Sequence, residues 1–105
     1  MDAYMIIEAE ISDPTQFAEY AQAVPAVVER YGGEYRVLGG THVPLEGDWG
    51  DVRLVISRWP SVDAAREFWN SEEYDEVRKL REGTGEFRIM VVEALPDDEA
   101  REAVE

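Results

Sequence analysis

The sequence predicts an α+β fold in which a four-stranded antiparallel sheet carries two helices on one face. A strand-like segment, a helical segment and a second strand-like segment follow one another in the first half of the chain, and the same order returns in the second half. A chain of 105 residues has room for one domain, and no linker divides its halves. Such repeats usually form the ferredoxin-like βαββαβ sandwich, so we expect a single domain over residues 1–95 and an acidic C-terminal tail over residues 96–105.

The first half begins with a strand over residues 4–11 and continues with a strongly marked helix. Asp13 can cap a helix over residues 14–31, and a proline follows it at the first helical position, where the missing N–H costs nothing. Pro25 predicts a kink or a break inside this helix. A pair of glycines leads to a second strand over residues 34–38. The buried stripe of the helix is predicted to consist of Phe17, Tyr20, Ala21, Val24, Val28 and Tyr31.

The second half repeats this order with a helix in two parts. A strand over residues 53–59 leads to Ser61, which can cap a helix from residue 62 to about residue 81. Ser71 has the character of a second cap, so we expect a local break before it and a new helical start directly after it. A fourth strand is predicted over residues 87–95.

Alternation along the strands predicts two unlike faces of the sheet. Met5, Ile7, Ala9 and Ile11 point to the helices, and the opposite face mixes charged and large apolar side chains. With the first strand between the third and the fourth, Glu8 and Glu10 should lie near Arg58 and Arg88. This second face is predicted to carry Tyr4, Ile6, Glu8, Glu10, Arg36, Leu38, Leu54, Ile56, Arg58, Arg88, Met90 and Val92.

A sheet face with so many aliphatic residues would make an exposed monomer prone to aggregation, so we expect a homodimer formed through this face. The alternative is an open-faced monomer whose large residues are scattered on a solvated sheet.

Composition excludes several other partners. The chain has 24 acidic and only 10 basic residues, and this negative charge repels nucleic acid. Its longest apolar runs are far too short to cross a membrane. Cysteine is absent and no secretion signal is recognisable, so we expect a cytoplasmic protein.

Scattered residues over most of the chain resemble a known bacterial family. They are Tyr31-Gly32-Gly33, Gly39-Gly40, Leu45-Glu46-Gly47-Asp48-Trp49, Trp59-Pro60-Ser61, Ala64-Ala65, Phe68-Trp69, Ser71, Tyr74 and Arg81. Together they resemble the domain-of-unknown-function family number thirteen-thirty, over about residues 3 to 95; Trp59 stands where that family commonly has Phe. The resemblance implies the dimeric α/β-barrel superfamily, whose relatives include cofactor-independent antibiotic-biosynthesis monooxygenases, muconolactone isomerases and haem proteins. It implies the fold and the dimer, and no established reaction.

His42, the only histidine, is a candidate catalytic residue. A pKa near neutrality suits proton transfer, and Glu46 and Asp48 are the nearest acids that could orient it. The alternative is a partly exposed histidine at a strand end, which we favour. One histidine with two acids lacks the spacing of a metal site, so no metal is expected, and no helical histidine is available for haem. We expect no cofactor. Trp49 either packs over the edge of the core or covers a ligand cavity.

Tyr74, Arg78 and Arg81 share one helical face because they stand at i, i+4 and i+7. Tyr74 and Arg81 are the other candidate catalytic residues, since a phenol and a guanidinium beside Phe68 and Trp69 suit a small aromatic or keto-acid ligand. Trp49, Phe68, Trp69 and Arg78 are the candidate ligand-binding residues. The alternative is that the basic residues complement the helix C-terminus and pair with nearby acids.

Three functions remain open from the sequence. The first is a homodimeric protein that binds a small organic molecule without chemistry, which we favour. The second is a cofactor-independent monooxygenase or isomerase that acts on a small aromatic or enolisable substrate. The third is a dimer with a filled core and no ligand. A cavity on which His42, Tyr74 or Arg81 converge would favour catalysis, and an apolar cavity would favour binding.

Overall fold

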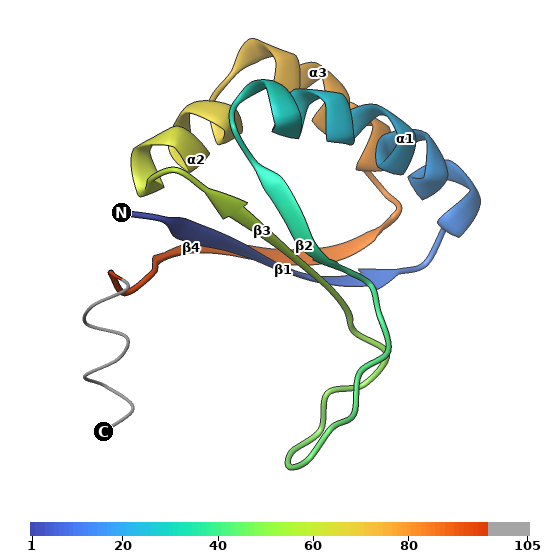
Figure 1. The fold of residues 1–105 in the computed structure, drawn as a ribbon. Helices are drawn as coiled ribbons and strands as arrows, with labels where there is room; N and C mark the ends of the chain where they lie inside the picture. Colours follow the sequence, from blue (N-terminus) through green and yellow to red (C-terminus); the bar gives the residue numbers. More distant parts are fainter. Residues whose placement is uncertain (97–105) are drawn as a thin grey trace, which may run out of the picture.

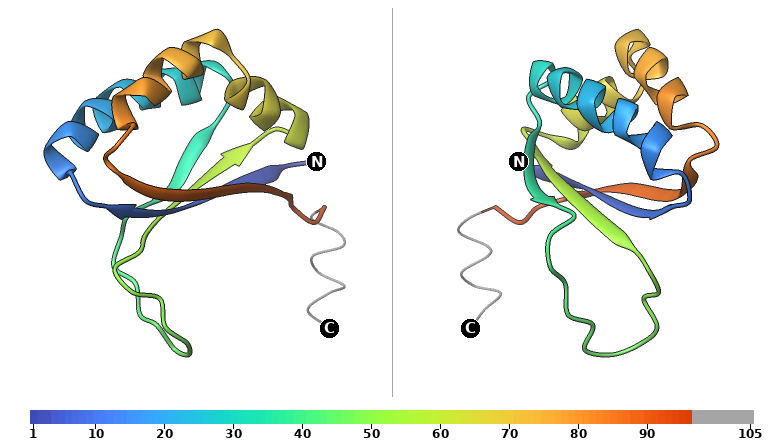
Figure 2. Two further views of the ribbon diagram at one scale, coloured as in Figure 1. Left: turned by 180° about the vertical axis from the view of Figure 1, so that it is seen from behind. Right: turned by 90° about the vertical axis from the view of Figure 1, so that its right-hand side faces the viewer.

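The protein is a two-layer sandwich in which helices cover one face of an antiparallel sheet (Figure 1). The computed structural model describes residues 1–96, so the predicted tail lies, from residue 97 onward, outside the described residues. The strand order is β2-β3-β1-β4, and the views in Figure 2 place all helices on the same side. The predicted ferredoxin-like fold class is confirmed. The elements are β1 (Ala3–Ile11), α1 (Pro14–Arg30), β2 (Glu34–Leu38), β3 (Arg53–Trp59), α2 (Val62–Trp69), α3 (Glu72–Arg78), the 3₁₀ helix η1 (Lys79–Arg81) and β4 (Gly85–Glu93).

The helices begin where capping side chains stand. The Asp13 carboxylate accepts a hydrogen bond from the backbone N–H of residue 16 at 3.1 Å. Ser61 and Ser71 accept from the N–H groups three residues further on, at 3.0 and 3.1 Å. Each cap satisfies a donor at the first turn that has no partner within the helix. The predicted restart of the helix after Ser71 is confirmed.

Helix α1 differs from its prediction at two points. It continues through Pro25, so the predicted break does not occur. Proline removes a single hydrogen bond of the helix, while Val24, Val27 and Val28 hold both sides of this position in the core. Val27 replaces Ala21 in the fully buried stripe, since Ala21 is exposed.

The core lies between the helices and the sheet and is dominated by aromatic rings in tilted contact. Phe68 lies at its centre, with ring centroids 4.9 Å from Trp59 and 4.6 Å from Tyr74. The buried Trp59 indole donates a hydrogen bond to the Ser57 hydroxyl at 2.8 Å. Gly33 fits against this cluster, because a Cβ there would lie 2.8 Å from the Trp59 ring.

The sheet register confirms part of the predicted pairing and corrects the rest. Glu8 lies opposite Arg88 and forms an ion pair with it. Glu10 instead lies opposite Glu86, so its predicted pairing with an arginine is wrong. Arg58 pairs with Asp2 at the other end of β1, because the antiparallel register places it opposite Tyr4, four residues from Glu8.

A β-bulge between Tyr35 and Val37 changes which side chains of β2 face the helices. The extra residue shifts the alternation, so Val37 lies opposite Ile56 and Leu38 lies opposite Val55. The prediction that Leu38 points away from the helices is therefore wrong. Leu38 joins the helix-facing side, where it lines a cavity with Val55.

Residues 39–52 form a long connection between β2 and β3, which we call the arm. The arm projects beyond the sheet on the side away from the helices (Figures 1 and 2). Three of its apolar side chains are unusually exposed, with 75% of Val43, 93% of Leu45 and 48% of Trp49 accessible to solvent. Within residues 1–96, no helix combines the length and the apolar character needed to cross a membrane.

Candidate functional site

A mostly apolar cavity of about 100 Å³ lies between α1 and the sheet. Ile7, Val24 and Ile89 supply aliphatic walls, and Phe17 and Phe87 supply a stacked aromatic pair with centroids 5.9 Å apart. Its polar lining side chains are Tyr20, Tyr35, Arg53 and Arg81. Small-molecule sites commonly measure about 300–1,000 Å³. This cavity is smaller than that range, so it suits a small ligand of about one ring.

Two phenols and a guanidinium meet beside this cavity, and two of the three groups, Tyr20 and Arg81, line it. The Tyr20 and Tyr74 hydroxyls are 3.0 Å apart and share a hydrogen bond. The Nη2 of Arg81 donates to the Tyr74 hydroxyl at 3.4 Å. Tyr74 is only 1% exposed, so its hydroxyl can find partners only inside the protein. We call these three residues the Tyr-Tyr-Arg cluster.

Aromatic rings hold the guanidinium of Arg81 in place. Its central carbon lies 4.6 Å from the Phe87 ring centroid and 5.7 Å from that of Tyr20. Its Nε is buried and has no hydrogen-bond partner among residues 1–96. Over the same residues, neither Arg81 nor Arg53 forms an ion pair with a carboxylate. The cavity therefore has a positively charged lining in a strongly acidic chain.

Burial keeps the cavity phenols protonated. Desolvation raises the pKa of Tyr20 well above its usual value, and the neighbouring Tyr74 raises it further through charge repulsion and their hydrogen bond. Desolvation also raises the pKa of Tyr35 to about 12. At neutral pH both groups are hydrogen-bond donors rather than bases.

The structure separates the candidate ligand-binding residues of α2 and α3 from the cavity. Phe68 is 2% exposed and belongs to the core. The Arg78 guanidinium lies 4.4 Å from the Trp69 ring centroid and donates to the Trp69 carbonyl at 3.0 Å. Trp69 in turn packs on Tyr74, with ring centroids 5.1 Å apart. Tyr74 is thus in contact with Phe68, Trp69 and Arg78, and none of these three residues lines the cavity.

His42 and Trp49 lie on the arm, apart from the Tyr-Tyr-Arg cluster. Both are exposed, and both line a shallow groove of about 400 Å³ that the cavity residues do not share. The Trp49 indole donates to the Glu46 carbonyl at 3.0 Å, which fixes the ring on the arm itself. The structure therefore brings Tyr74 and Arg81 together and leaves His42 elsewhere.

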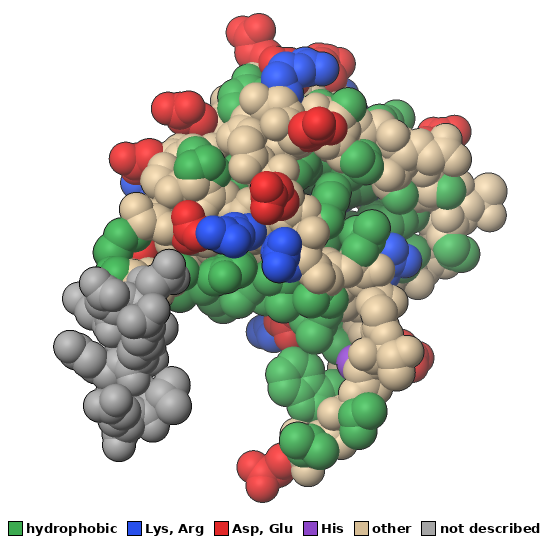
Figure 3. All heavy atoms as spheres, in the orientation of Figure 1, with side chains coloured by type: hydrophobic (Ala, Val, Ile, Leu, Met, Phe, Trp, Pro, Cys, Tyr) green, Lys and Arg blue, Asp and Glu red, His purple; other side chains and the backbone are tan. Residues whose placement is uncertain are grey.

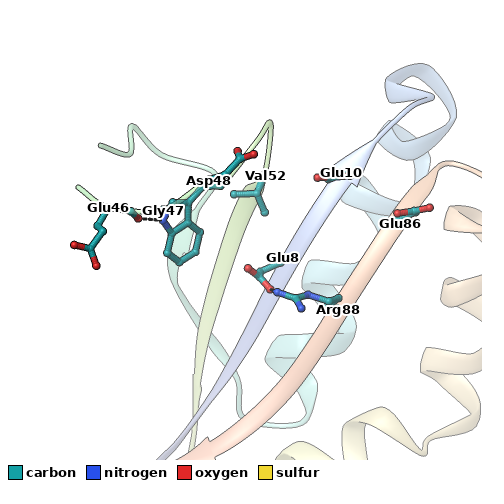
Figure 4. A pocket seen from close by; sticks show the side chains of 9 residues that line it. Glu8, Glu10, Glu46, Gly47, Asp48, Val52, Glu86 and Arg88 are labelled. Carbon is teal, nitrogen blue, oxygen red and sulfur yellow. Dashed lines mark hydrogen bonds and ion pairs between the residues drawn. The ribbon is translucent and has the colours of Figure 1, made fainter. Parts of the chain in front are cut away.

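A concave space of about 540 Å³ lies between the arm and the helix-free face of the sheet (Figure 4). Five carboxylates line it, and Arg88 is the one basic side chain there, paired with Glu8. Over residues 1–96, no three His, Asp or Glu side chains are placed to hold a metal ion. This space faces away from the helices and from the Tyr-Tyr-Arg cluster. Its acidic residues are Glu8, Glu10, Glu46, Asp48 and Glu86.

Sequence reasoning missed Tyr20, Tyr35 and Arg53 as residues of the site. Tyr20 carried a usable signal, because a phenol within an apolar helical stripe needs a buried partner for its hydroxyl. Arg53 carried no such signal, since an arginine at a strand start usually faces solvent. Only the antiparallel register, which places Arg53 opposite the helix-facing Ala9, brings it to the cavity.

The family model described as a domain of unknown function (DUF1330) matches residues 2–95. No curated protein sequence matches the chain. A solved protein of unknown function from Rhodopseudomonas palustris is 21% identical, with a TM-score of 0.76 and coverage of 90% of this chain and 83% of that one.

Two further solved structures share the fold. SnoaB, a cofactor-independent oxygenase from Streptomyces nogalater, is 13% identical, with a TM-score of 0.68 and coverage of 90% of this chain and 94% of that one. A dimeric protein of unknown function and ferredoxin-like fold from Bacteroides fragilis is also 13% identical, with a TM-score of 0.61 and coverage of 89% and 96%.

Proposed function

The chain belongs to the DUF1330 family, and from this premise we propose that it is a homodimer that binds a small organic molecule in the cavity between α1 and the sheet. The observation that carries the proposal is the Tyr-Tyr-Arg cluster, whose Tyr20 and Arg81 line a mostly apolar cavity. Apolar walls with a few convergent polar groups are typical of small-molecule sites. A core that served packing alone would gain nothing from a guanidinium in its wall.

The homodimer is proposed from the helix-free face of the sheet. Ile56, Ile6 and Met90 form a continuous row across β3, β1 and β4. Met90 is 63% exposed and Val92 is 45% exposed, which leaves apolar surface open to water in a single subunit. Figure 3 shows hydrophobic side chains along the lower margin of the sheet and on the arm beneath it. A second copy of the sheet would cover both surfaces.

The dimer is tested by adding one negative charge to this face. Met90→Glu would place a carboxylate in the buried interface, so we expect it to sediment as a monomer of 12.0 kDa while the wild type sediments at twice that mass. Gln22→Glu adds the same charge on the exposed side of α1 and should leave the dimer intact. A wild type that sediments at 12.0 kDa at micromolar concentration would refute the dimer.

Ligand binding is tested with single-ring compounds and a variant that fills the cavity. Ala21 lines the cavity and is exposed, so Ala21→Phe can place a ring there without disturbing the core. We expect phenylacetate, benzoate and their amides to shift NMR signals of Ile7 and Ile89 in the wild type and to bind Ala21→Phe at least tenfold more weakly. Ala26→Phe, on another side of α1, is the control. If no compound of this set shifts those signals, the proposed site is wrong.

A cofactor-independent enzyme is the second proposal. It is favoured by the hydrogen-bonded phenols beside Arg81, because donors arranged in this way stabilise an oxyanion or enolate. Similarity to SnoaB supports the fold that such an enzyme could use. The enzyme would consume an enolisable ring compound with no added cofactor, and Tyr74→Phe would slow the turnover more than it weakens binding. If the wild type binds such compounds and leaves them unchanged, binding is the function.

A further inference from the structure

We propose that the ligand of this cavity is a small organic anion, a single-ring carboxylate or enolate, whose negative group is held by Arg81, with Arg53 in the lining of the same cavity. The inference rests on the proposed binding function and names the chemical class of its ligand. Its evidence is the charge of the cavity lining, the fixed geometry of Arg81, and the combination of a few polar side chains with a mostly apolar lining.

The first argument is charge pairing. In a chain with a net charge of -14, five of the nine basic side chains within residues 1–96 form ion pairs, including those of Arg30, Arg58 and Arg88. The cavity joins two arginines that have no such partner within residues 1–96. Arg53 is exposed, whereas Arg81 is half-buried and its Nε is buried. A guanidinium removed from water without a counter-charge lowers stability, and a bound anion would offset that cost at Arg81.

The second argument is the fixed position of Arg81. Phe87 and Tyr20 flank its guanidinium, and Tyr74 occupies one Nη group. A planar fork that is already ordered loses little side-chain entropy on binding and can bond both oxygens of a carboxylate. The Tyr20–Tyr74 hydrogen bond uses only one of its two hydroxyl protons, so the pair has a second proton to donate to the same anion.

The third argument is the place of Arg53 and of the apolar walls. Arg53 lies against Gly39, where a Cβ would approach its Nε to 2.8 Å, and Gly39 has a φ of 64° that favours glycine. This glycine leaves room for the arginine to reach the cavity wall. Ile7, Val24 and Ile89 line the rest, where a ring would be buried. A ligand with one anionic group and one apolar ring matches this combination of arginines and apolar side chains.

The test compares acids with amides of the same shape. Phenylacetate and phenylacetamide, and benzoate and benzamide, differ mainly in charge, and their dissociation constants are measured by NMR titration at pH 7. We expect the wild type to bind each acid about tenfold or more tightly than its amide, since a hydrogen bond to a charged group is stronger than a neutral one. Arg81→Gln should abolish this preference while the amides bind within about threefold of wild type. Arg81→Lys, which keeps the charge, should retain part of it.

Arg53→Gln is expected to weaken the binding of the acids about two- to threefold. Arg66→Gln is the matched control that should change nothing, because Arg66 is an exposed arginine of α2 that forms no ion pair within residues 1–96. The Nε–H signal of Arg81 in the wild type gives a readout that needs no variant, and it should shift on addition of phenylacetate. Equal affinity for acids and amides, or a preference that survives Arg81→Gln, would refute the anion site while binding itself stands. Absence of any binding would refute the proposed function and this inference together.

Discussion

Removal of the Tyr74 hydroxyl tests whether the Tyr-Tyr-Arg cluster is an interacting network. Tyr74→Phe leaves the Tyr20 hydroxyl and one N–H of Arg81 without their shared partner, in a site where Tyr74 itself is 1% exposed. A lost hydrogen bond costs about 1 kcal/mol, and a buried polar group left unpaired costs about 1–3 kcal/mol. We expect Tyr74→Phe to lower the free energy of unfolding by about 2–3 kcal/mol.

Tyr20→Phe breaks the same Tyr20–Tyr74 hydrogen bond by removing the other hydroxyl. It should lower the free energy of unfolding by only about 1 kcal/mol, because the Tyr74 hydroxyl keeps its bond to Arg81. The double variant no longer strands the Tyr20 hydroxyl, so its loss should fall short of the sum of the single losses by about 1 kcal/mol. That difference is the coupling free energy between the two hydroxyls.

Urea unfolding at pH 7 measures these free energies, at one fixed protein concentration because the unfolding of a dimer depends on it. Tyr35→Phe is the control, since the Tyr35 hydroxyl lines the same cavity but has no side-chain hydrogen bond within residues 1–96. If Tyr74→Phe costs no more than Tyr35→Phe, or if the two single losses add without coupling, the hydrogen bonds of the cluster do not stabilise the fold.

Three further perturbations test the packing, the capping and the buried phenols. Gly33→Ala should lower the free energy of unfolding by about 1–3 kcal/mol, because its Cβ would meet the Trp59 ring at 2.8 Å, while Gly40→Ala, with open space around its Cβ, should be nearly neutral in the same urea titration. Ser71→Ala should cost about 1 kcal/mol by removing the cap of α3, and Ser71→Asp should restore most of it; equal losses in the two would contradict a capping role. Burial raises the pKa of Tyr35 from 10.0 to about 12, so the native state holds this proton more tightly than the unfolded chain does. The free energy of unfolding should therefore be unaffected by this group below pH 10 and should fall as the pH rises toward 12. Urea titrations at alkaline pH should show a smaller fall for Tyr35→Phe. If the free energy of unfolding depends on pH in the same way in the variant and the wild type, the raised pKa of Tyr35 is contradicted.

Most of the secondary structure followed from the sequence because its signals are local. The caps Asp13, Ser61 and Ser71 act on N–H groups three residues away, and the strand alternation is a property of each strand alone. These patterns, repeated in the two halves, also indicated the strand order β2-β3-β1-β4. At the candidate site, only the pairing of Tyr74 with Arg81 was accessible in this way, because both lie on one continuous helical stretch.

Tertiary structure alone decided which distant residues meet. Tyr20 reaches Tyr74 only because α1 packs beside α3, and Arg53 reaches the same cavity only through its rung opposite Ala9. The bulge in β2 turned Leu38 toward the helices, and the register set Glu10 opposite a like charge. Each of these contacts depends on how two elements fit together, so no periodicity within one element could specify it.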